Sequence, residues 1–295
     1  MAELCRQCPR ACLIDRTEHV GFCGVSDAFC VARAALHAWE EPILSGTRGS
    51  GTLFFSGCNL RCVFCQNYDV SHAAKGKTVS AEKLEALMLR LQDEGAHNIN
   101  LVTPTQYAKQ LTAVLERVKP KLHIPVVYNC GGYESVEALR ALEGLVDVWL
   151  PDFKYYSSEL SKKYSAASDY YEVALLSLTE MLRQCPALEY GADGMLLRGV
   201  IVRHLVLPGN RKDSMEVLKR LAERFGTKAF LLSLMSQYTP QFAKNTPYRE
   251  LHREVTTFEY QSVADLALSL GFEGFFQDKD SATAAYTPDF TEETL

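Results

Sequence analysis

Short runs rich in β-branched and aromatic residues alternate with longer amphipathic stretches from residue 51 onward. This alternation is typical of repeated βα units, in which a helix returns the chain so that successive strands lie parallel in one sheet. Because helices cover such a sheet, the pattern constrains the architecture of most of the chain. The six runs predicted to be strands are 52–56, 98–103, 125–129, 146–151, 200–206 and 229–233.

The stretches between the predicted strands carry signals for helix ends. Ser80 is placed to cap a helix that Gly95 ends, and Thr256 with Glu259 has the capping-box spacing for a helix that ends at Gly271. Six βα units predict an α/β fold with a partial (β/α)6 barrel rather than a closed barrel of eight. A doubly wound sheet is the alternative, and in either fold a site forms at the C-terminal ends of the strands.

The beginning of the chain differs from the rest. It carries four close-set cysteines and little periodicity, so we expect a short Cys-rich metal-binding segment at residues 1–45, followed by the barrel domain at residues 46–295. A net charge of -5 provides no basic field, so nucleic acid is not an expected partner. The sequence shows neither a membrane-spanning apolar run nor a signal peptide, which predicts a cytoplasmic protein without membrane contact.

Three cysteines follow the first predicted strand directly. Cys58, Cys62 and Cys65 have the spacing C-x3-C-x2-C within GTLFFSGCNLRCVFCQNY, on a loop at the C-terminal end of that strand. Each thiolate can bind one iron of a [4Fe-4S] cluster, which leaves the fourth iron open to an exogenous ligand. The alternative is a structural zinc site, but zinc needs a fourth nearby ligand and only His72 follows closely enough.

S-adenosylmethionine is a ligand that suits such an open iron, which it chelates through its amino and carboxylate groups. An electron from the reduced cluster then cleaves a sulfur–carbon bond, and the resulting 5'-deoxyadenosyl radical abstracts hydrogen from a substrate. The competing class is a non-catalytic iron–sulfur or zinc protein that acts as an electron carrier or assembly factor. A carrier normally saturates its cluster with four protein ligands, whereas this loop supplies three.

A second group of cysteines lies near the start of the chain. Cys5, Cys8, Cys12 and Cys23 offer four thiolates, which are enough for a zinc ion or a second iron–sulfur cluster. A second cluster would pass electrons to the first, whereas zinc would only hold the segment folded. The spacing favours a metal over free thiols and leaves both metals open.

The sequence FSGCNLRCVFCQN resembles the cluster loop of pyruvate formate-lyase activating enzymes and other glycyl-radical-enzyme activases. With CRQCPRAC, NLVTPTQY, VVYNCGGYES, LPDFKYY and VRHLVLPG, nearly the whole chain is similar to the activase-related PflX-type branch of radical S-adenosylmethionine proteins. The resemblance implies the partial (β/α)6 barrel and an electron donor such as flavodoxin or ferredoxin. It also implies a substrate that receives the radical, either a glycine of a partner protein or a small molecule.

The resemblance also implies cofactor contacts late in the barrel. Asp152 and Lys154 match an Asp-x-Lys pattern at the end of the fourth strand, which implies contacts to the cofactor's carboxylate or to an associated monovalent cation. Arg203 matches an arginine that precedes a Val/Leu-Pro-Gly turn and faces the cofactor. Arg203 and His204 lie on opposite sides of their strand, so at most one of them is expected to point into the barrel.

The early part of the barrel departs from the activase pattern. The Gly-Gly-Glu-Pro segment that binds the cofactor's amino group is replaced by Val102-Thr103-Pro104-Thr105, so Thr103 and Thr105 are the expected acceptors there. Asn129 ends the third strand, where activases supply cation or cofactor contacts. Cys130 is either a hydrogen donor for a radical relay or a small buried thiol, and the second is the commoner arrangement.

Overall fold

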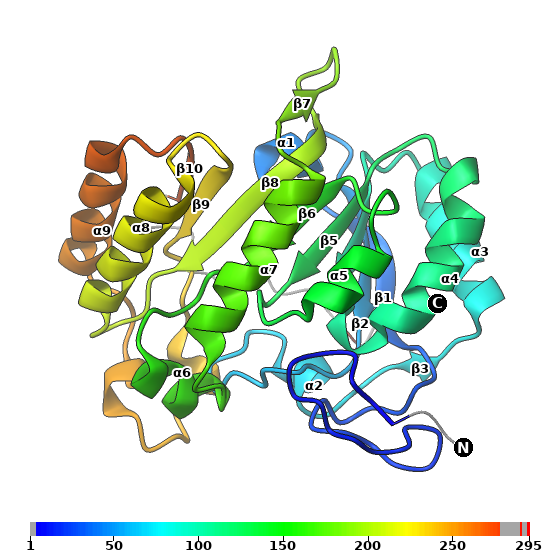
Figure 1. Cartoon of the computed structure of the whole chain (residues 1–295), viewed down its shortest axis with the longest axis horizontal. Coiled ribbons are helices and arrows are strands. Elements are labelled where there is room, and N and C mark those ends of the chain that lie inside the picture. The colour runs from blue at the N-terminus through cyan, green and yellow to red at the C-terminus, as the bar shows by residue number, and fades with distance from the viewer. Residues whose placement is uncertain (1–3, 278–289, 291–293) are drawn as a thin grey trace.

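The computed structural model describes residues 4–277, 290, 294 and 295, and these residues form an open α/β barrel (Figure 1). The parallel strands are β2 (Ser50–Phe55), β4 (Ile99–Val102), β5 (Val126–Cys130), β6 (Val148–Pro151), β8 (Leu196–Leu205), β9 (Leu231–Met235) and β10 (Gly274–Phe276). The first six of these are the six strands that the sequence predicts, with ends that differ by a few residues. The predicted fold class, a partial barrel, is confirmed.

Strand order decides between the two architectures that the sequence allowed. The parallel strands lie in the order β10-β9-β8-β6-β5-β4-β2, so every neighbour is the next parallel strand along the chain. A doubly wound sheet would reverse direction at a switch point, and this order has no reversal. The sheet continues from β2 to β1 and β3, and its described ends, β10 and β3, do not pair with each other.

Two antiparallel strands extend the sheet beyond β2. β1 (Cys30–His37) pairs antiparallel with β2, and β3 (Lys77–Thr78) pairs with β1. A further short strand, β7 (Glu189–Tyr190), pairs only with β8. Residues 30–45, which the sequence analysis placed in the Cys-rich segment, therefore supply a sheet strand, whereas residues 4–29 contain no helix or strand.

Helices cover the sheet and connect its strands. The longer ones are α3 (Ala81–Asp93), α4 (Ala108–Val118), α5 (Val136–Ala141), α6 (Ser158–Ser165), α7 (Tyr170–Gln184), α8 (Arg211–Phe225) and α9 (Thr257–Leu270). The side chain of Ser80 accepts a hydrogen bond from the N–H of Lys83, and Thr256 and Glu259 form the predicted capping box. In the described part of the chain, none of the helices has the length and apolar character needed to cross a membrane.

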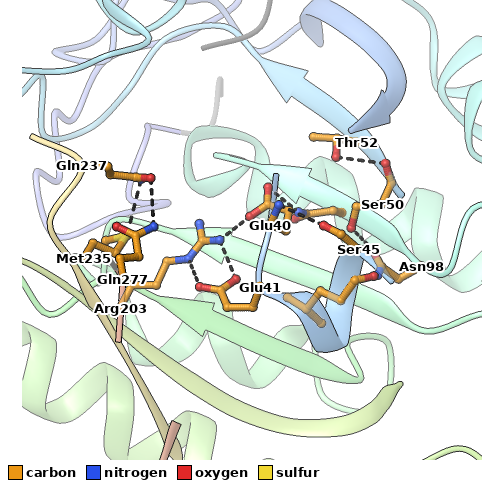
Figure 2. Close-up of polar contacts among 12 residues, drawn as sticks. Glu40, Glu41, Ser45, Ser50, Thr52, Asn98, Arg203, Met235, Gln237 and Gln277 are labelled. Carbon is orange, nitrogen blue, oxygen red and sulfur yellow. Dashed lines mark hydrogen bonds and ion pairs between the residues drawn. The ribbon is translucent and has the colours of Figure 1, made fainter. Parts of the chain in front are cut away.

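The short helix α1 (Pro42–Ser45) fills the inside of the barrel at the side opposite the C-terminal ends of the strands. Leu44 is fully buried against Val127 and Val148, which lie in the first halves of β5 and β6, and against Ile201 in the middle of β8. Asn98 fixes this helix by donating a hydrogen bond to the carbonyl oxygen of Leu44 at 2.8 Å (Figure 2). The helix α1 therefore closes the interior at the N-terminal side of the strands, and space remains near their C-terminal ends.

The turn after β5 supplies a test of packing at this rim. Gly132 has φ +77°, and a Cβ there would lie 2.1 Å from the carbonyl oxygen of Asp152. Gly144 has nearly the same φ, +79°, with open space around it. We expect Gly144→Ala to lower the free energy of unfolding by about 1–2 kcal/mol through backbone strain alone. Gly132→Ala should lower it by roughly 1–3 kcal/mol more, through overpacking.

Urea unfolding of the wild type and both variants measures these differences. Equal losses in the two variants would contradict the close packing between the β5 turn and the end of β6.

Candidate functional site

The three-cysteine loop begins where β2 ends, as the sequence predicts. Gly57 has φ +83°, which turns the chain out of the strand. The N–H of Cys58 donates to the carbonyl oxygen of Cys23 at 3.2 Å, and the N–H of Leu60 donates to Cys58 Sγ at 3.4 Å. Such N–H···S contacts stabilise a thiolate, so the backbone of this loop is arranged to support a sulfur ligand.

Cys58, Cys62 and Cys65 line one cavity at the C-terminal ends of the strands. Several of the predicted cofactor residues line the same cavity, namely Thr103, Asn129, Asp152, Lys154 and Arg203. They come from four strand ends, those of β4, β5, β6 and β8. The barrel therefore gathers residues that are up to 145 positions apart in sequence (58 to 203) around one space.

The thiols of the loop lie in a dry environment. Burial, with the nearby Cys62 and Cys65 thiols, raises the pKa of Cys58 to about 12, and burial with Cys62 raises the pKa of Cys65. Ser165 donates a hydrogen bond to Cys62 Sγ at 3.0 Å. A bound metal would reverse the protonation of these groups, because metal ligation requires thiolates.

A single metal ion has stricter geometric needs than a cluster. Among the residues that the structure describes, no three His, Cys, Asp or Glu side chains are close enough together to hold one ion. A cubane cluster makes a different demand, because each thiolate binds a different iron. The spacing between the loop thiols therefore suits a cluster, in which each thiol binds its own iron, better than a site for one ion.

Asp152 and Lys154 form an ion pair at the end of β6, with both side chains largely buried. Although burial opposes its charge, Lys154 has its pKa raised because the Asp152 carboxylate lies beside it. The hydroxyl of Tyr170 accepts from the N–H of Lys154 at 2.9 Å and lies within 3.0 Å of the carbonyl oxygens of Gly131 and Asp152. Tyr170 therefore joins the ends of β5 and β6 and holds the ion pair at the rim.

Arg203 has protein partners that the sequence did not suggest. Its Nε and Nη2 donate to the two carboxylate oxygens of Glu41 at 2.7 and 2.6 Å, and Nη2 also contacts Glu40 (Figure 2). Arg203 lines the cavity, whereas His204 points away and binds the carbonyl oxygen of Phe153 at 2.6 Å. Burial lowers the pKa of His204 to about 4, so its imidazole is neutral at pH 7.

The two threonines expected at the end of β4 lie in different places. Thr103 lines the cavity, while Thr105 is fully buried and donates its hydroxyl to Glu134 at 2.8 Å. Thr105 is absent from the residues that line the cavity. The structure therefore brings five of the six predicted cofactor residues together and separates Thr105 from them.

Glu134 is a buried acid that the sequence analysis did not identify. It is 2% exposed, and its partners are neutral donors: the hydroxyls of Thr105 and Tyr128 and the thiol of Cys130. Burial raises its pKa to about 7. Cys130 is 1% exposed and its thiol is hydrogen-bonded to Glu134, so its surroundings are those of a small buried thiol.

The Cys-rich segment packs against the cluster loop. Arg10 donates from Nε to the carbonyl oxygen of Asn59 at 2.8 Å and from Nη2 to that of Ser165 at 3.0 Å, while its guanidinium lies 4.0 Å from the ring centroid of Phe22. Burial raises the pKa of Cys8 to about 12, and the Cys23 and Cys12 thiols add to the effect. The N-terminal cysteines are therefore near one another and next to the loop.

Sequence reasoning missed several residues that line the cavity. Trp39 and Glu40 follow β1, and Gln237 follows β9. No motif marks them, because their place depends on how the chain after β1 crosses the barrel. Glu40-Glu41 immediately before Pro42, a residue suited to the first helical turn, is the only local hint that this segment precedes a helix.

The protein is an open parallel barrel, and its first parallel strand leads directly into a three-cysteine loop. This places it in the class of barrel proteins whose site lies at the C-terminal ends of the strands. The family model described as the Radical SAM superfamily matches residues 52–222, which is more than half of the chain. The chain belongs to the radical S-adenosylmethionine (SAM) superfamily, whose members are enzymes. The family prediction is confirmed at this level.

Relatives and solved structures agree with this assignment. An uncharacterized protein of Methanocaldococcus jannaschii is 29% identical over 273 residues, which cover 89% of this chain and 74% of that protein. The chain is similar to methylornithine synthase, with a TM-score of 0.51 and 16% identity over 82% of this chain and 67% of that one. For Streptococcus suis SuiB bound to S-adenosylmethionine, the TM-score is 0.50, with 11% identity over 75% and 48% of the chains. These two structures share the fold.

The buried ion pair of Arg203 provides a test of how the cavity floor is held. Glu41 is 5% exposed in this pair, whereas the Lys228–Glu273 pair is about two-thirds exposed. We expect Glu41→Ala to lower the free energy of unfolding by about 3 kcal/mol, because it leaves a buried cation short of a partner. Glu273→Ala should change it by less than about 1 kcal/mol. Chemical denaturation compares the two, and losses of similar size would refute the structural role of Glu41.

Glu134 should make stability depend on pH. Because its folded pKa lies above that of an unfolded glutamate, the folded state binds the proton more tightly, so this contribution is complete below about pH 4.3 and is lost as pH rises through about 7. Relative to Glu134→Gln, the wild type should lose roughly 3 kcal/mol between these limits. Urea unfolding of both proteins across this range measures the effect, and a difference that does not vary with pH would show an ordinary pKa.

Proposed function

We propose that this protein is a radical SAM enzyme that binds a [4Fe-4S] cluster through Cys58, Cys62 and Cys65 and S-adenosylmethionine in the adjoining cavity. The observation that carries the proposal is that the three thiols and five predicted cofactor residues line one cavity. When bound, the reduced cluster and S-adenosylmethionine supply a 5'-deoxyadenosyl radical that abstracts hydrogen.

The donor set fits a cluster with one open iron. Three thiols from one loop offer one ligand to each of three irons, and the N–H of Leu60 and the hydroxyl of Ser165 already contact two of the sulfurs. Gly131 leaves room for the loop, since a Cβ there would lie 2.7 Å from Leu60 Cδ1. Phe64, which lies in the loop between Cys62 and Cys65, is buried and limits access of water to the sulfurs.

The charged and polar residues of the cavity suit the polar end of S-adenosylmethionine. Lys154 provides a point charge for the carboxylate, Asp152 pairs with its ammonium group, and Tyr170 accepts a hydrogen bond from its backbone N–H. The hydroxyl oxygen of Thr103 and the amide oxygen of Asn129 can accept hydrogen bonds from the amino group of S-adenosylmethionine. A monovalent cation beside Asp152 is part of the proposal. Thr105 has no part in this arrangement because its hydroxyl serves Glu134.

The substrate side of the reaction extends the proposal further. An activase-like modification of a glycine in a partner protein fits the resemblance of the cluster loop, and electrons would come from a flavodoxin or ferredoxin. SuiB, which shares the fold, has also been solved with its precursor peptide SuiA. The alternative is a non-catalytic iron–sulfur or zinc protein that acts as an electron carrier or assembly factor, which would form no 5'-deoxyadenosine.

The N-terminal cysteines extend the proposal to a second metal. Cys5, Cys8, Cys12 and Cys23 would hold a second iron–sulfur cluster, or a zinc ion once their thiols move closer together than they are in this structure. The hydrogen bond from Cys58 N–H to the carbonyl oxygen of Cys23 joins the two regions directly. Analysis of iron and zinc in the purified protein decides between the metals. Iron beyond that of one cluster supports an electron relay, and zinc supports a structural role.

Cys62→Ala tests the proposed chemistry. Protein reconstituted without oxygen should form 5'-deoxyadenosine from S-adenosylmethionine once reduced, and Cys62→Ala should reduce this product to background because one iron loses its ligand. The control is Cys185→Ala, since Cys185 is buried in the main core away from the cavity and should leave the product near the wild-type amount. Absence of product from a wild-type protein with an intact cluster would favour the electron carrier.

A further inference from the structure

A second cavity adjoins the proposed cofactor cavity. It has a volume of about 320 Å³, at the lower end of the range of small-molecule pockets. Trp39, Glu40 and Gln237 line both cavities, so the two spaces meet at these side chains. The residues that follow β1 form one side of the second cavity, and Gln237 and Gln277, which follow β9 and β10, form the other.

The wall between the two cavities carries an excess of negative charge. Arg203 is the shared partner of two carboxylates, Glu40 and Glu41, and all three side chains are 14% exposed or less. The other charged residues of the cofactor cavity, Asp152 and Lys154, neutralise each other. One buried negative charge therefore exceeds the positive charge of this wall, and burial makes a cationic ligand the favourable complement.

Acceptor atoms at this wall retain unused capacity. A carboxylate has about four acceptor sites, and the contacts of Glu40 with Asn100 and Arg203 use one on each of its oxygens. Asn100 is completely buried and donates its amide N–H to Glu40, but its carbonyl oxygen has no partner in the described part of the protein. Asn100 points into the barrel, on the same side of β4 as Val102, which lines the cavity. Because Asn100 lines neither cavity, the acceptor sites open to an ammonium group, which has three N–H donors, are those of Glu40.

An aromatic ring completes the arrangement. The indole of Trp39 is 56% exposed and lines both cavities beside Glu40. A cation held over an indole face gains electrostatic attraction to the ring. On the opposite side, Gln277 Nε2 donates to Gln237 Oε1 at 3.1 Å, so these carboxamides form a polar rim that orders the far wall (Figure 2).

We propose that the second cavity is a substrate subsite that binds a primary ammonium group, with Glu40 as its counter-ion and Trp39 as its aromatic wall. This inference rests on the proposed radical SAM function, because it assigns the substrate class to the same site. The ammonium group belongs either to a free alkylamine or to a lysine side chain in a peptide. Arg203 and Asn100 hold the Glu40 carboxylate in place for either ligand.

Tryptophan fluorescence of the reconstituted protein provides the test. The chain has two tryptophans, and since Trp149 is fully buried, a change on titration reports on Trp39. Butylammonium chloride should change the emission with saturation, and butanol, which is similar in size but uncharged, should not. Glu40→Gln should weaken butylammonium binding roughly tenfold or more, because a charge-assisted hydrogen bond is lost.

Three further arms make the result decisive. Glu116→Gln, an exposed change on α4, should bind like the wild type, and Glu40→Asp should keep the preference for butylammonium over butanol even if it binds more weakly. Tighter binding of the peptide acetyl-Gly-Lys-Gly-amide than of butylammonium would assign the group to a peptide, and the reverse would assign it to a small amine. Either result supports the subsite.

The proposal is overturned if butanol and butylammonium act alike, or if a folded Glu40→Gln variant, checked by circular dichroism, binds butylammonium as the wild type does. Formation of 5'-deoxyadenosine without added amine is measured in parallel. Its absence would refute the radical SAM function, whereas its presence with no ammonium selectivity would refute the subsite alone.

Discussion

The ion pair of Arg203 with Glu40 and Glu41 joins two parts of the sheet that backbone hydrogen bonds do not connect. Arg203 lies in β8 and the glutamates follow β1, and four strands separate β8 from β1 along the sheet. Taking these charges out of water is expensive, but the paired hydrogen bonds between the guanidinium and Glu41 offset much of the loss. The curvature of an open barrel thus depends on a polar contact across its interior, supported by α1.

Local signals explain why much of this fold could be predicted. The parallel strands lie in apolar runs bounded by turns, and Ser80, Thr256 and Glu259 form caps that need only neighbouring residues. The three-cysteine loop is equally local, because its spacing and its place after a strand are both visible in the sequence. β1 escaped notice because its alanine-rich run, CVARAALH, has a weak preference for strand.

Long-range partners explain what could not be predicted. Glu41 and Arg203 are 162 residues apart, and nothing local in either segment indicates that they meet. Thr105 was expected beside Thr103, yet a turn of 3-10 helix directs its hydroxyl to Glu134. The sequence pattern places a residue at a strand end, whereas the direction of its side chain depends on which buried group offers a hydrogen bond.

The two sides of the site differ in how tightly the sheet constrains them. The ends of β5 and β6 are fixed by mutual contacts through Tyr170, so a substitution there disturbs several strand ends at once. The segments around Trp39 and Gln237 lie at the other side of the site, in the connections from β1 to β2 and from β9 to β10. Because connecting loops tolerate change better than the strands they join, the shape of the second cavity can be altered on this side of the site while the strand ends around the cysteines keep their places.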